Sequence, residues 1–439
     1  MRIAVVGAGI VGVTTAYELA VDGHEVTVFE RQASVAAETS FANAGVLAPG
    51  YVTPWAAPGM TGKVLRQMFG RHAAVRLARP FPPSLLGWIW RWRRACRASV
   101  YQANRRRMIQ LARFSLLRMH LLSAELQLEF EQGKGLLVLL RSPRDLSLAR
   151  PGVKVLADLG VNCHVVEGAR AREIEPGLNP DTALHAALHL PDEEVGNCRQ
   201  FAHLLKQHAQ ARGAIFRFHR EVQRIDAGDK PIVYHRALAR FDPAQLTGAE
   251  HPTTLPESEG MEPFDAVVVC AAMDSLGLLS RLKVRLPLAP VHGYSVTAPL
   301  RGATEHGEAG PRATLIDERF KVAISRLGKR VRVAGGAELG GTLATSNEAA
   351  LATLYKVLDD WFPGCSLQAQ AQSWKGARPM LPDGPPVVGA SGAPGVWLNL
   401  GHGSSGFALS CGSARVLADA MAQRPPAIDL DGLGVERLR

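Results

Sequence analysis

Three glycines near the N-terminus have the spacing that is needed to hold a phosphate group. An apolar run over residues 2–6 leads into Gly7, Gly9 and Gly12 (G-x-G-x-x-G), and a second apolar run ends at Glu30. Gly7 permits a tight turn, Gly9 lets the backbone approach a pyrophosphate, and Gly12 lets a helix pack closely on the strand. The N–H groups that begin this helix would face the phosphates, and the Glu30 carboxylate would bind a ribose diol. The pattern predicts a βαβ dinucleotide-binding unit and does not distinguish NAD from FAD.

A second glycine-rich turn lies near the C-terminus. Residues 399–407 read N-L-G-H-G-S-S-G-F, and this stretch is expected to follow a buried strand and to open a helix. Backbone N–H groups at such a turn can face the pyrimidine end of a flavin, which becomes anionic on reduction. Upstream, Arg378 begins the stretch R-P-M-L-P-D-G, a turn that would hold its guanidinium at a fixed position. Found in this order with the N-terminal unit, the two features favour FAD.

The elements that must position these groups are spread along the whole chain. A chain of 439 residues is expected to form two domains. Strands of the buried, parallel type are expected near residues 3, 26, 215, 266 and 397, with long helical and antiparallel segments between them. The nucleotide-binding domain is therefore expected to be discontinuous. This layout also favours FAD, since an NAD domain normally completes its sheet in one continuous stretch.

Local signals predict several of the intervening elements. Apolar side chains at helical spacing predict a long helix from about residue 100 to 132. Asn197 is expected to cap a helix over residues 198–211, which Gly213 would end. Residues 228–263 are rich in Pro, Gly, Thr and Glu, and we expect an extended surface hairpin or loop there.

Composition and cysteine usage are typical of a soluble globular protein from a reducing compartment. The chain is 47% hydrophobic and 21% charged, and no apolar run is long enough to span a membrane. The six cysteines are scattered without a C-x-x-C pair, which argues against a disulfide framework and against a zinc site. The N-terminal apolar stretch is a strand broken by glycines, unlike a signal peptide. We therefore expect a cytoplasmic protein without a bound metal.

The formal net charge of +10 is concentrated in one segment. Residues 39–124 include 14 Lys or Arg residues and no Asp or Glu, and within them residues 85–92 read L-L-G-W-I-W-R-W. One interpretation is peripheral contact with an anionic membrane, with tryptophans at the level of the lipid headgroups. The alternative is a helix with a packed aromatic face and a solvated basic face. Nucleic-acid binding is not expected, because no recognition module accompanies the charge.

Several motifs carry a resemblance to a known family. The two glycine turns occur together with further specific stretches: E-T-S-F-A-N-A-G (38–45), P-G-Y (49–51), P-W-A-A-P-G (54–59), L-P-D-E (190–193), G-Y-S (293–295) and R-P (378–379). The chain thereby resembles the FAD-dependent amino-acid oxidoreductases of the D-amino-acid oxidase superfamily, and within it the small subunits of bacterial D-amino-acid dehydrogenases. The resemblance covers essentially the whole chain.

The resemblance implies an α/β fold with two interleaved domains. One is a Rossmann-like FAD-binding domain of the glutathione-reductase/p-hydroxybenzoate-hydroxylase type, which we expect to comprise residues 1–50, 190–282 and 386–439. The other is an α+β substrate-binding domain with an antiparallel sheet, which we expect to comprise residues 51–189 and 283–385.

The resemblance also implies oxidation of the Cα–N bond of a D-amino acid. Arg378 is the first candidate to bind the substrate, because a dry pocket for a carboxylate calls for a guanidinium. Tyr51 and Tyr294 could bind the carboxylate or shield the flavin, or could pack as amphipathic core residues. His402 could contact the flavin or the substrate, or could be structural. His292 stands where the family usually has Lys or Arg, which places a titratable group near the site.

For the cofactor, we expect contacts from both glycine turns and from the segment that follows the second strand. The expected residues are Gly7, Gly9, Ile10, Val11, Gly12, Glu30, Arg31, Ser40, Asn43, Ala44, Gly45, Val222, Gly401, His402, Gly403, Ser404 and Gly406. After the strand that ends at Cys270 the family usually has a glycine and then an aromatic-serine pair, whereas this chain reads A-A-M-D-S over residues 271–275. We expect a looser approach of the backbone to the cofactor there.

The leading hypothesis is a FAD-dependent D-amino-acid dehydrogenase that acts on small neutral substrates such as D-alanine. Hydride would pass from Cα to flavin N5, and the products would be a 2-oxo acid and ammonia. The electrons would pass to a quinone or another acceptor than O₂, at the inner face of the bacterial plasma membrane if the basic segment contacts lipid. One alternative is an oxidase or dehydrogenase for glycine, sarcosine or proline. Another is a non-catalytic flavin-binding scaffold or electron-relay subunit.

Overall fold

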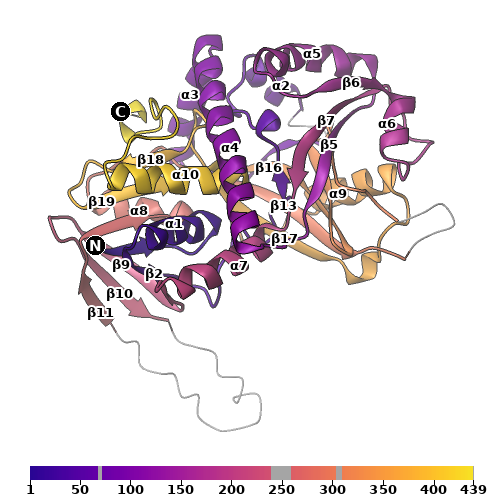
Figure 1. Ribbon diagram of the computed structural model, residues 1–439. Helices are drawn as coiled ribbons and strands as arrows, with labels where there is room; N and C mark the ends of the chain where they lie inside the picture. The colour runs from indigo at the N-terminus through magenta and orange to yellow at the C-terminus, as the bar shows by residue number, and fades with distance from the viewer. Residues whose placement is uncertain (68–71, 239–258, 303–308, 439) are drawn as a thin grey trace, which may run out of the picture.

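Three β-sheets organise the computed structural model, which describes residues 1–67, 72–238, 259–302 and 309–438 (Figure 1). One sheet has six strands, one has three and one has ten. The six-stranded and ten-stranded sheets are each built from segments that are far apart in the sequence. This arrangement agrees with the expected α/β fold and its two interleaved parts.

The six-stranded sheet contains all five predicted parallel strands. Its order is β18 (Val387–Ala390), β19 (Val396–Leu400), β12 (Ala266–Val269), β1 (Arg2–Val6), β2 (Glu25–Phe29) and β8 (Ile215–Arg217). All neighbours pair in parallel except β18, which is antiparallel to β19. The expected burial of the strand near residue 215 was wrong, since Ile215 is 54% exposed. The reason is that β8 is an edge strand and is paired only with β2.

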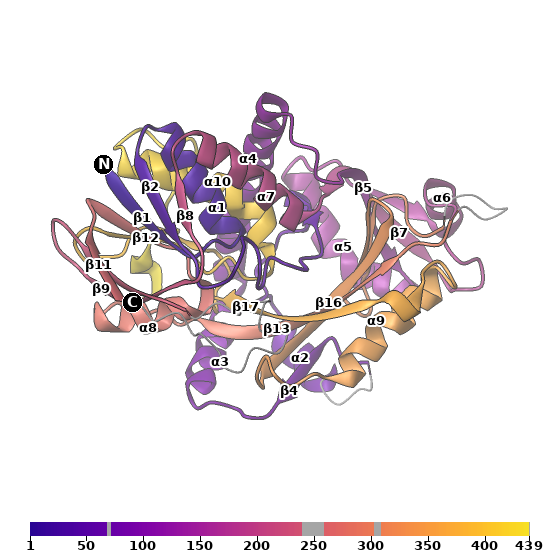
Figure 2. The same ribbon diagram turned by 90° about the horizontal axis from the view of Figure 1, so that it is seen from below.

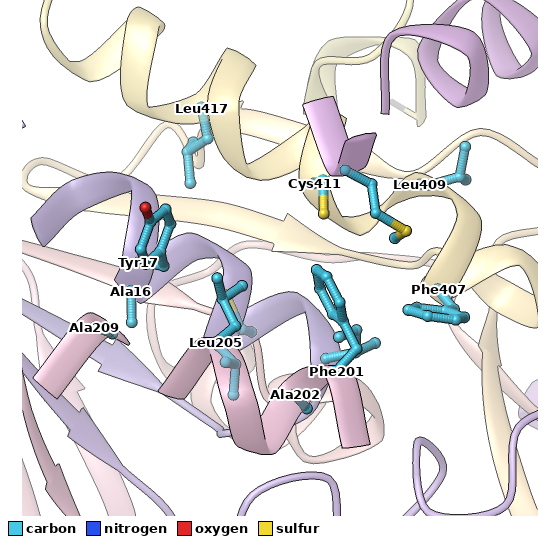
Figure 3. Packing of buried hydrophobic residues seen from close by; sticks show 14 of the residues in the cluster. Ala16, Tyr17, Phe201, Ala202, Leu205, Ala209, Phe407, Leu409, Cys411 and Leu417 are labelled. Carbon is cyan, nitrogen blue, oxygen red and sulfur yellow. The ribbon is translucent and has the colours of Figure 1, made fainter. Parts of the chain in front are cut away.

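Four helices cover one face of this sheet around a shared apolar core. They are α1 (Ile10–Val21), α4 (Ala98–Leu126), α7 (Cys198–Ala211) and α10 (Gly406–Met421). Figure 3 shows Tyr17 of α1, Phe201 and Leu205 of α7, and Phe407 of α10 within this cluster. A Cβ atom on Gly412 would lie 2.9 Å from the backbone of Ser115, so this glycine permits the close crossing of α10 and α4.

The three-stranded sheet includes a hairpin, β10 (Ile232–Ala237) with β11 (Glu259–Pro263), within the residues 228–263 for which a hairpin or loop was expected. Strand β10 pairs antiparallel with both β9 (Arg220–Asp226) and β11. The middle of the expected hairpin, residues 239–258, lies outside the described residues.

The ten-stranded sheet lies beside the six-stranded sheet and forms most of the other side of the molecule (Figure 2). Its order is β17 (Gln372–Met380), β13 (Ala289–Pro299), β16 (Arg330–Gly340), β15 (Val322–Leu327), β14 (Thr314–Asp317), β5 (Gly133–Leu140), β7 (Ala186–Val195) and β3 (Val46–Leu47), with β4 (Val75–Ala78) on β16 and β6 (His164–Glu167) on β7. Pairing is antiparallel except between β14 and β5 and between β16 and β4. One face packs against α9 (Glu348–Trp361), and the opposite face carries separate apolar clusters.

The remaining α-helices connect and flank these sheets. They are α2 (Met60–Gln67), α3 (Ser84–Ala95), α5 (Pro143–Asp158), α6 (Gly168–Ile174) and α8 (Ser275–Arg281). Among the described residues, none of the helices combines the length and the apolar character needed to cross a membrane.

Two predicted helices can be compared with the structure directly. The helix over residues 198–211 is confirmed, and the Asn197 side chain accepts a hydrogen bond from the backbone of Gln200 at 3.2 Å. The helix expected to end near residue 132 ends instead at Leu126. Gln127 adopts a left-handed conformation with φ of 52°, which breaks the helix there.

The division into a FAD-binding and a substrate-binding domain stays a proposal, and the strand pairing bears on its boundaries. Strand β3 (Val46–Leu47) pairs with β7 (Ala186–Val195) in the ten-stranded sheet. The proposed limits at residues 50 and 190 would therefore separate β3 from its sheet and cut through β7.

A buried carboxylate ties three of the helices together. Glu18 on α1 is fully buried and accepts hydrogen bonds from Arg118 of α4 at 2.7 Å and from Arg415 of α10 at 2.8 Å. Arg415 also pairs with Asp22 at 2.7 Å. Because charges inside a protein are costly unless they are paired, these contacts fix how the three helices pack.

We expect Glu18→Gln to lower the free energy of unfolding by about 3 kcal/mol, because Arg118 would stay buried without a counter-charge. Urea denaturation of the purified protein measures the change. Glu173→Gln is the matched control: its partner Arg170 lies on the surface, so little change is expected. Equal stability of the two variants would contradict the assigned role of Glu18.

Candidate functional site

A cavity of about 540 Å³ opens where strands β1, β2 and β12 end. Ligands of open parallel sheets commonly bind at this edge, beyond the carboxyl ends of the strands. Six of the predicted cofactor residues line it: Gly7, Gly9, Glu30, Arg31, Ser40 and Val222. The structure thus brings the N-terminal glycine turn, the carboxylate of the second strand and β9 to one place.

The glycine turn has the geometry that the spacing predicts. Gly7 has a φ of +99°, and a Cβ atom on Gly12 would lie only 1.9 Å from the carbonyl oxygen of Gly7. Gly9 is the N-cap of α1, and the Ser40 hydroxyl accepts a hydrogen bond from the N–H of Ile10 at 3.1 Å. A helix start with free N–H groups beside a hydroxyl fits the pyrophosphate of a dinucleotide. Val11, in the first turn of the same helix, is half-buried.

Glu30 faces this cavity but is also held by the backbone. One carboxylate oxygen accepts from the N–H of Ala8 at 2.7 Å and the other from the N–H of Gln32 at 2.8 Å. Burial raises the pKa of this carboxyl, and the two N–H groups partly offset that effect. A carboxylate has about four acceptor positions, so lone pairs remain for a ribose diol.

Charged residues line the cavity, and two of them, Glu38 and Asp274, were not selected from the sequence. Arg31 pairs with Glu38 at 2.6 Å and with Asp274 at 2.8 Å. Asp274 belongs to the stretch 271–275, whose departure from the family pattern marked it as unusual. The backbone there lies close to the glycine turn, since a Cβ atom on Gly7 would lie 3.1 Å from Cα of Ala271. The looser approach to the cofactor stays a prediction. Further lining residues that the sequence reasoning missed are Thr39, Arg220, Glu221, Ala272 and Met273.

The segment after Ser40 leaves this cavity and joins the ten-stranded sheet. The Asn43 side chain accepts from the N–H of Gly45 at 2.8 Å, and Gly45 has a φ of +81°. Ala44 packs beside the apolar cluster of β5 and β7. Asn43, Ala44 and Gly45 therefore form a second group of predicted cofactor residues, separate from the cavity.

The C-terminal glycine turn lies beside β17. Gly401 and Gly403 have positive φ angles of 83° and 57°, Ser404 is exposed, and Gly406 is the first residue of α10. His402 forms an isolated bridge with Met380 at the end of β17. The structure thus places the turn next to the strand that carries Arg378.

His402 holds this turn against α10. Its ring is buried, and Nε2 lies 2.9 Å from the hydroxyl of Ser413. Burial lowers its pKa to about 3, so the ring is neutral at physiological pH. Of the two roles left open for His402, this geometry favours the structural one.

Arg378 presents a guanidinium without a counter-charge. Its Nη1 donates to the carbonyl of Gly336 at 2.7 Å, and among the described residues no carboxylate forms an ion pair with it. A Cβ atom on Gly293 would lie 2.2 Å from Nη2, so only glycine leaves room for this side chain. Burial lowers the pKa of Arg378 to about 10, which leaves it charged at neutral pH. The site can therefore bind an anion.

Tyr51 lies on the same side of the sheet as Arg378. It packs with the apolar cluster that includes Ile316 and Ala323, and its hydroxyl donates to Glu318 at 3.2 Å. Arg378 and Ala323 occupy the same face, because the paired residues of β17, β13, β16 and β15 alternate in register. Burial and the Glu318 charge raise the pKa of Tyr51, so the phenol stays protonated.

Tyr294 and His292 lie on the other face. Tyr294 packs with the α9 cluster and donates to Glu338 at 3.0 Å, while His292 Nδ1 lies 3.0 Å from the carbonyl of Gly340. Burial and the nearby Lys375 lower the pKa of His292. The structure does not bring these two residues to Arg378, since alternate residues of a strand point to opposite faces. We therefore assign them to support of the sheet rather than to substrate contact.

We expect Gly12→Ala to lose most of the bound nucleotide, because its Cβ atom would overlap the carbonyl oxygen of Gly7 and displace α1. The nucleotide released by heating is quantified by its absorbance per mole of protein. Gly87→Ala is the matched control, since a Cβ atom at Gly87 has no neighbour within 4 Å. Full nucleotide content in Gly12→Ala would refute the close-packing argument.

Comparison with known proteins assigns this chain to a family. The model of the FAD dependent oxidoreductase (DAO) family matches residues 2–420. A D-amino acid dehydrogenase of Rhizorhabdus wittichii is 39% identical over 439 residues and covers 100% of both chains. A D-amino acid dehydrogenase of Cereibacter sphaeroides is 40% identical and covers 100% of this chain and 95% of the relative.

Solved structures show the same fold at lower identity. Glycine oxidase from Geobacillus kaustophilus has a TM-score of 0.70 and 19% identity, covering 99% of this chain and 98% of that chain. L-proline dehydrogenase from P. horikoshii has a TM-score of 0.70 and 16% identity, covering 99% and 97%. With a family model that spans nearly the whole chain, this protein belongs to the FAD dependent oxidoreductases, and FAD is its cofactor.

Proposed function

We propose that this protein is a D-amino-acid dehydrogenase that oxidises small neutral D-amino acids and passes the electrons to a quinone or another acceptor than O₂. The observation that carries the proposal is Arg378, a partly buried guanidinium without a carboxylate partner among the described residues. A cation in such a place is stabilised by an anionic ligand, and the α-carboxylate of an amino acid supplies one. The names of the full-length relatives support the choice of D-amino acids.

FAD, when bound, accepts a hydride from Cα of the substrate. The protein's own residues bind, orient and enclose the substrate. Arg378 holds the carboxylate, and Tyr51 lies on the same face of the sheet. The amino acid leaves as an iminium ion, and water converts this ion to a 2-oxo acid and ammonia.

The part of the sheet beside Arg378 supports a preference for substrates with small side chains. Gly293 lies under the Arg378 guanidinium. Beside it, the same face of the sheet carries Ser295, Ala334 and Ala323, which pair across β13, β16 and β15. None of these three side chains is larger than a hydroxymethyl group, and Trp374 of β17, which pairs with Ser295, limits the row at its other end. The preference for D-alanine rests on this row.

Anaerobic mixing with substrates tests the proposed reaction. We expect the flavin absorbance near 450 nm to bleach with D-alanine and to persist with L-alanine. Arg378→Met is expected to retain FAD. At low D-alanine concentration, its flavin should be reduced by the substrate at least about 30-fold less efficiently, because a lost buried charge pair costs about 2–5 kcal/mol. Arg378→Lys should be intermediate, since it keeps the charge and loses the fork geometry.

Other outcomes identify the alternatives. Bleaching by glycine, sarcosine or D-proline in preference to D-alanine would favour an oxidoreductase for secondary amines or glycine. No bleaching by any amino acid would favour a flavin-binding scaffold. Loss of flavin from Arg378→Met would make Arg378 a structural residue.

We also propose that helix α3 contacts an anionic membrane, which would place the protein near a quinone. Trp88 and Trp92 are buried against Trp55, so much of the aromatic content of the segment is packed inside. Leu86 and Trp90, one turn apart, are 62% and 56% exposed. The exposed side chains Arg93, Arg94 and Arg97 follow, and the Arg94 guanidinium lies over the Trp90 ring. An exposed apolar pair beside several cations fits an anionic lipid surface.

We expect the protein to sediment with anionic vesicles at low salt and not with zwitterionic ones. Each exposed arginine near the surface is worth about 1 kcal/mol, so Arg93→Gln with Arg94→Gln should weaken binding roughly 30-fold. Leu148→Ser, at an exposed leucine of α5, is the control that should bind normally. Equal binding to both kinds of vesicle, or none at low salt, would rule out this contact.

A further inference from the structure

A second arginine is buried without a counter-charge, and the sequence reasoning did not select it. Arg332 on β16 is 5% exposed. Its Nε donates to the hydroxyl of Thr297 and its Nη1 to the backbone carbonyl of Asn43, both at 2.9 Å. Both acceptors are neutral, and no ion pair to Arg332 occurs among the described residues. Burial and the neighbouring Arg330 lower its pKa to about 10, so it is charged at neutral pH.

The surroundings of Arg332 do not neutralise it. The nearest carboxylate, Glu131, already pairs with Arg330 at 2.9 Å. Cys198 lies close, but burial raises the pKa of this thiol far above neutrality, so it is no counter-ion. Arg199 adds a further cation, with its guanidinium 4.2 Å from the centre of the Phe41 ring. The apoprotein therefore holds excess positive charge beside the segment from Phe41 to Asn43.

The substrate proposed for Arg378 cannot supply the missing anion. Arg332 pairs with Thr297 on β13, and Gly293, which lies under the Arg378 guanidinium, is four residues away on the same strand, so the two positions lie about 13 Å apart at 3.3 Å per residue. Thr297 is the residue paired with Arg332 on β13, so the Arg332 guanidinium stays over its own position. A small amino acid is much shorter than 13 Å. Figure 2 shows β17, β13 and β16 as neighbouring strands of the sheet.

We propose that Arg332 is a positioning residue that acts on the redox state of the flavin. It holds the backbone at Asn43, and its uncompensated charge stabilises the anion that forms when the neutral ring takes up two electrons and one proton. The inference rests on FAD as the cofactor, and it takes the expected cofactor contacts of Asn43, Ala44 and Gly45 to be contacts with the flavin ring. It does not depend on which substrate is oxidised.

The size of the effect follows from the burial of the charge. Two charges interact several times more strongly inside a protein than in water, because the interior has a lower effective dielectric constant. Loss of the Arg332 charge is therefore expected to weaken the preference for reduced flavin at least tenfold. For a two-electron couple, a tenfold change corresponds to about 30 mV.

The test is a reductive titration of the holoenzyme against a reference dye, without any amino acid. Arg332→Met should lower the midpoint potential of the bound FAD by at least about 30 mV. Arg332→Lys should retain most of the potential, because it keeps the charge. Lys329→Met is the matched control: it removes one positive charge from an exposed position at the start of β16, where water screens it, and should leave the potential unchanged.

Three results would overturn the proposal. They are an unchanged potential in Arg332→Met, an equal fall in Arg332→Met and Lys329→Met, and loss of FAD from both Arg332→Met and Arg332→Lys. The last result would make Arg332 a purely structural brace. If only Arg332→Met loses FAD, Arg332→Gln replaces it in the titration with the same expected fall. Because the titration uses a chemical reductant, its outcome is independent of the proposed reaction with D-alanine.

Discussion

The close contact between α1 and β1 is the constraint on which the rest of the structure depends. At Gly12 the helix lies so near the carbonyl of Gly7 that no side chain fits between them. This contact sets the position of α1, and α1 is the helix on which both α7 and α10 pack. Glu18, two turns further along α1, then fixes α4 and α10 through arginines. The absence of a side chain at Gly12 is therefore required both for the nucleotide-binding turn and for the packing of the helices.

The charged groups on the two faces of the ten-stranded sheet differ in how they are paired. On the α9 side, Glu338 binds Tyr294 and Lys375, so the charges there are satisfied within the protein. On the other side, the acceptors that Arg378 and Arg332 have within the described part of the chain are all neutral. Such groups are costly in the unliganded protein and become favourable when an anion binds. The distribution of satisfied and unsatisfied charge therefore marks the working face of the sheet.

Much of the fold could be predicted from the sequence because its signals are local. Glycine spacing, apolar runs and the Asn197 cap each depend on a few neighbouring residues, and the corresponding strands and helix are where they were expected. The end of α4 could not be predicted, since it depends on the left-handed conformation of Gln127.

The face of a strand residue could not be predicted either, because it depends on register in a sheet whose strands come from distant segments. Tyr294 and His292 were for this reason grouped with Arg378, although they point away from it. Arg332 was missed because the alternation R-V-R-V at the start of β16 carries no functional motif. That it is buried with only neutral acceptors among the described residues became evident from the packing around it.

Both ends of the chain meet in the six-stranded sheet, where β12 separates β1 from β19. During synthesis the N-terminal strands emerge first, and the sheet cannot be completed until strands that are made much later have emerged. Until β19 and α10 arrive, the apolar face of α1 lacks one of its covering helices. The nascent chain therefore exposes this surface for most of its translation, and exposed apolar surface favours aggregation. The complete binding site arises only once the last helix has left the ribosome.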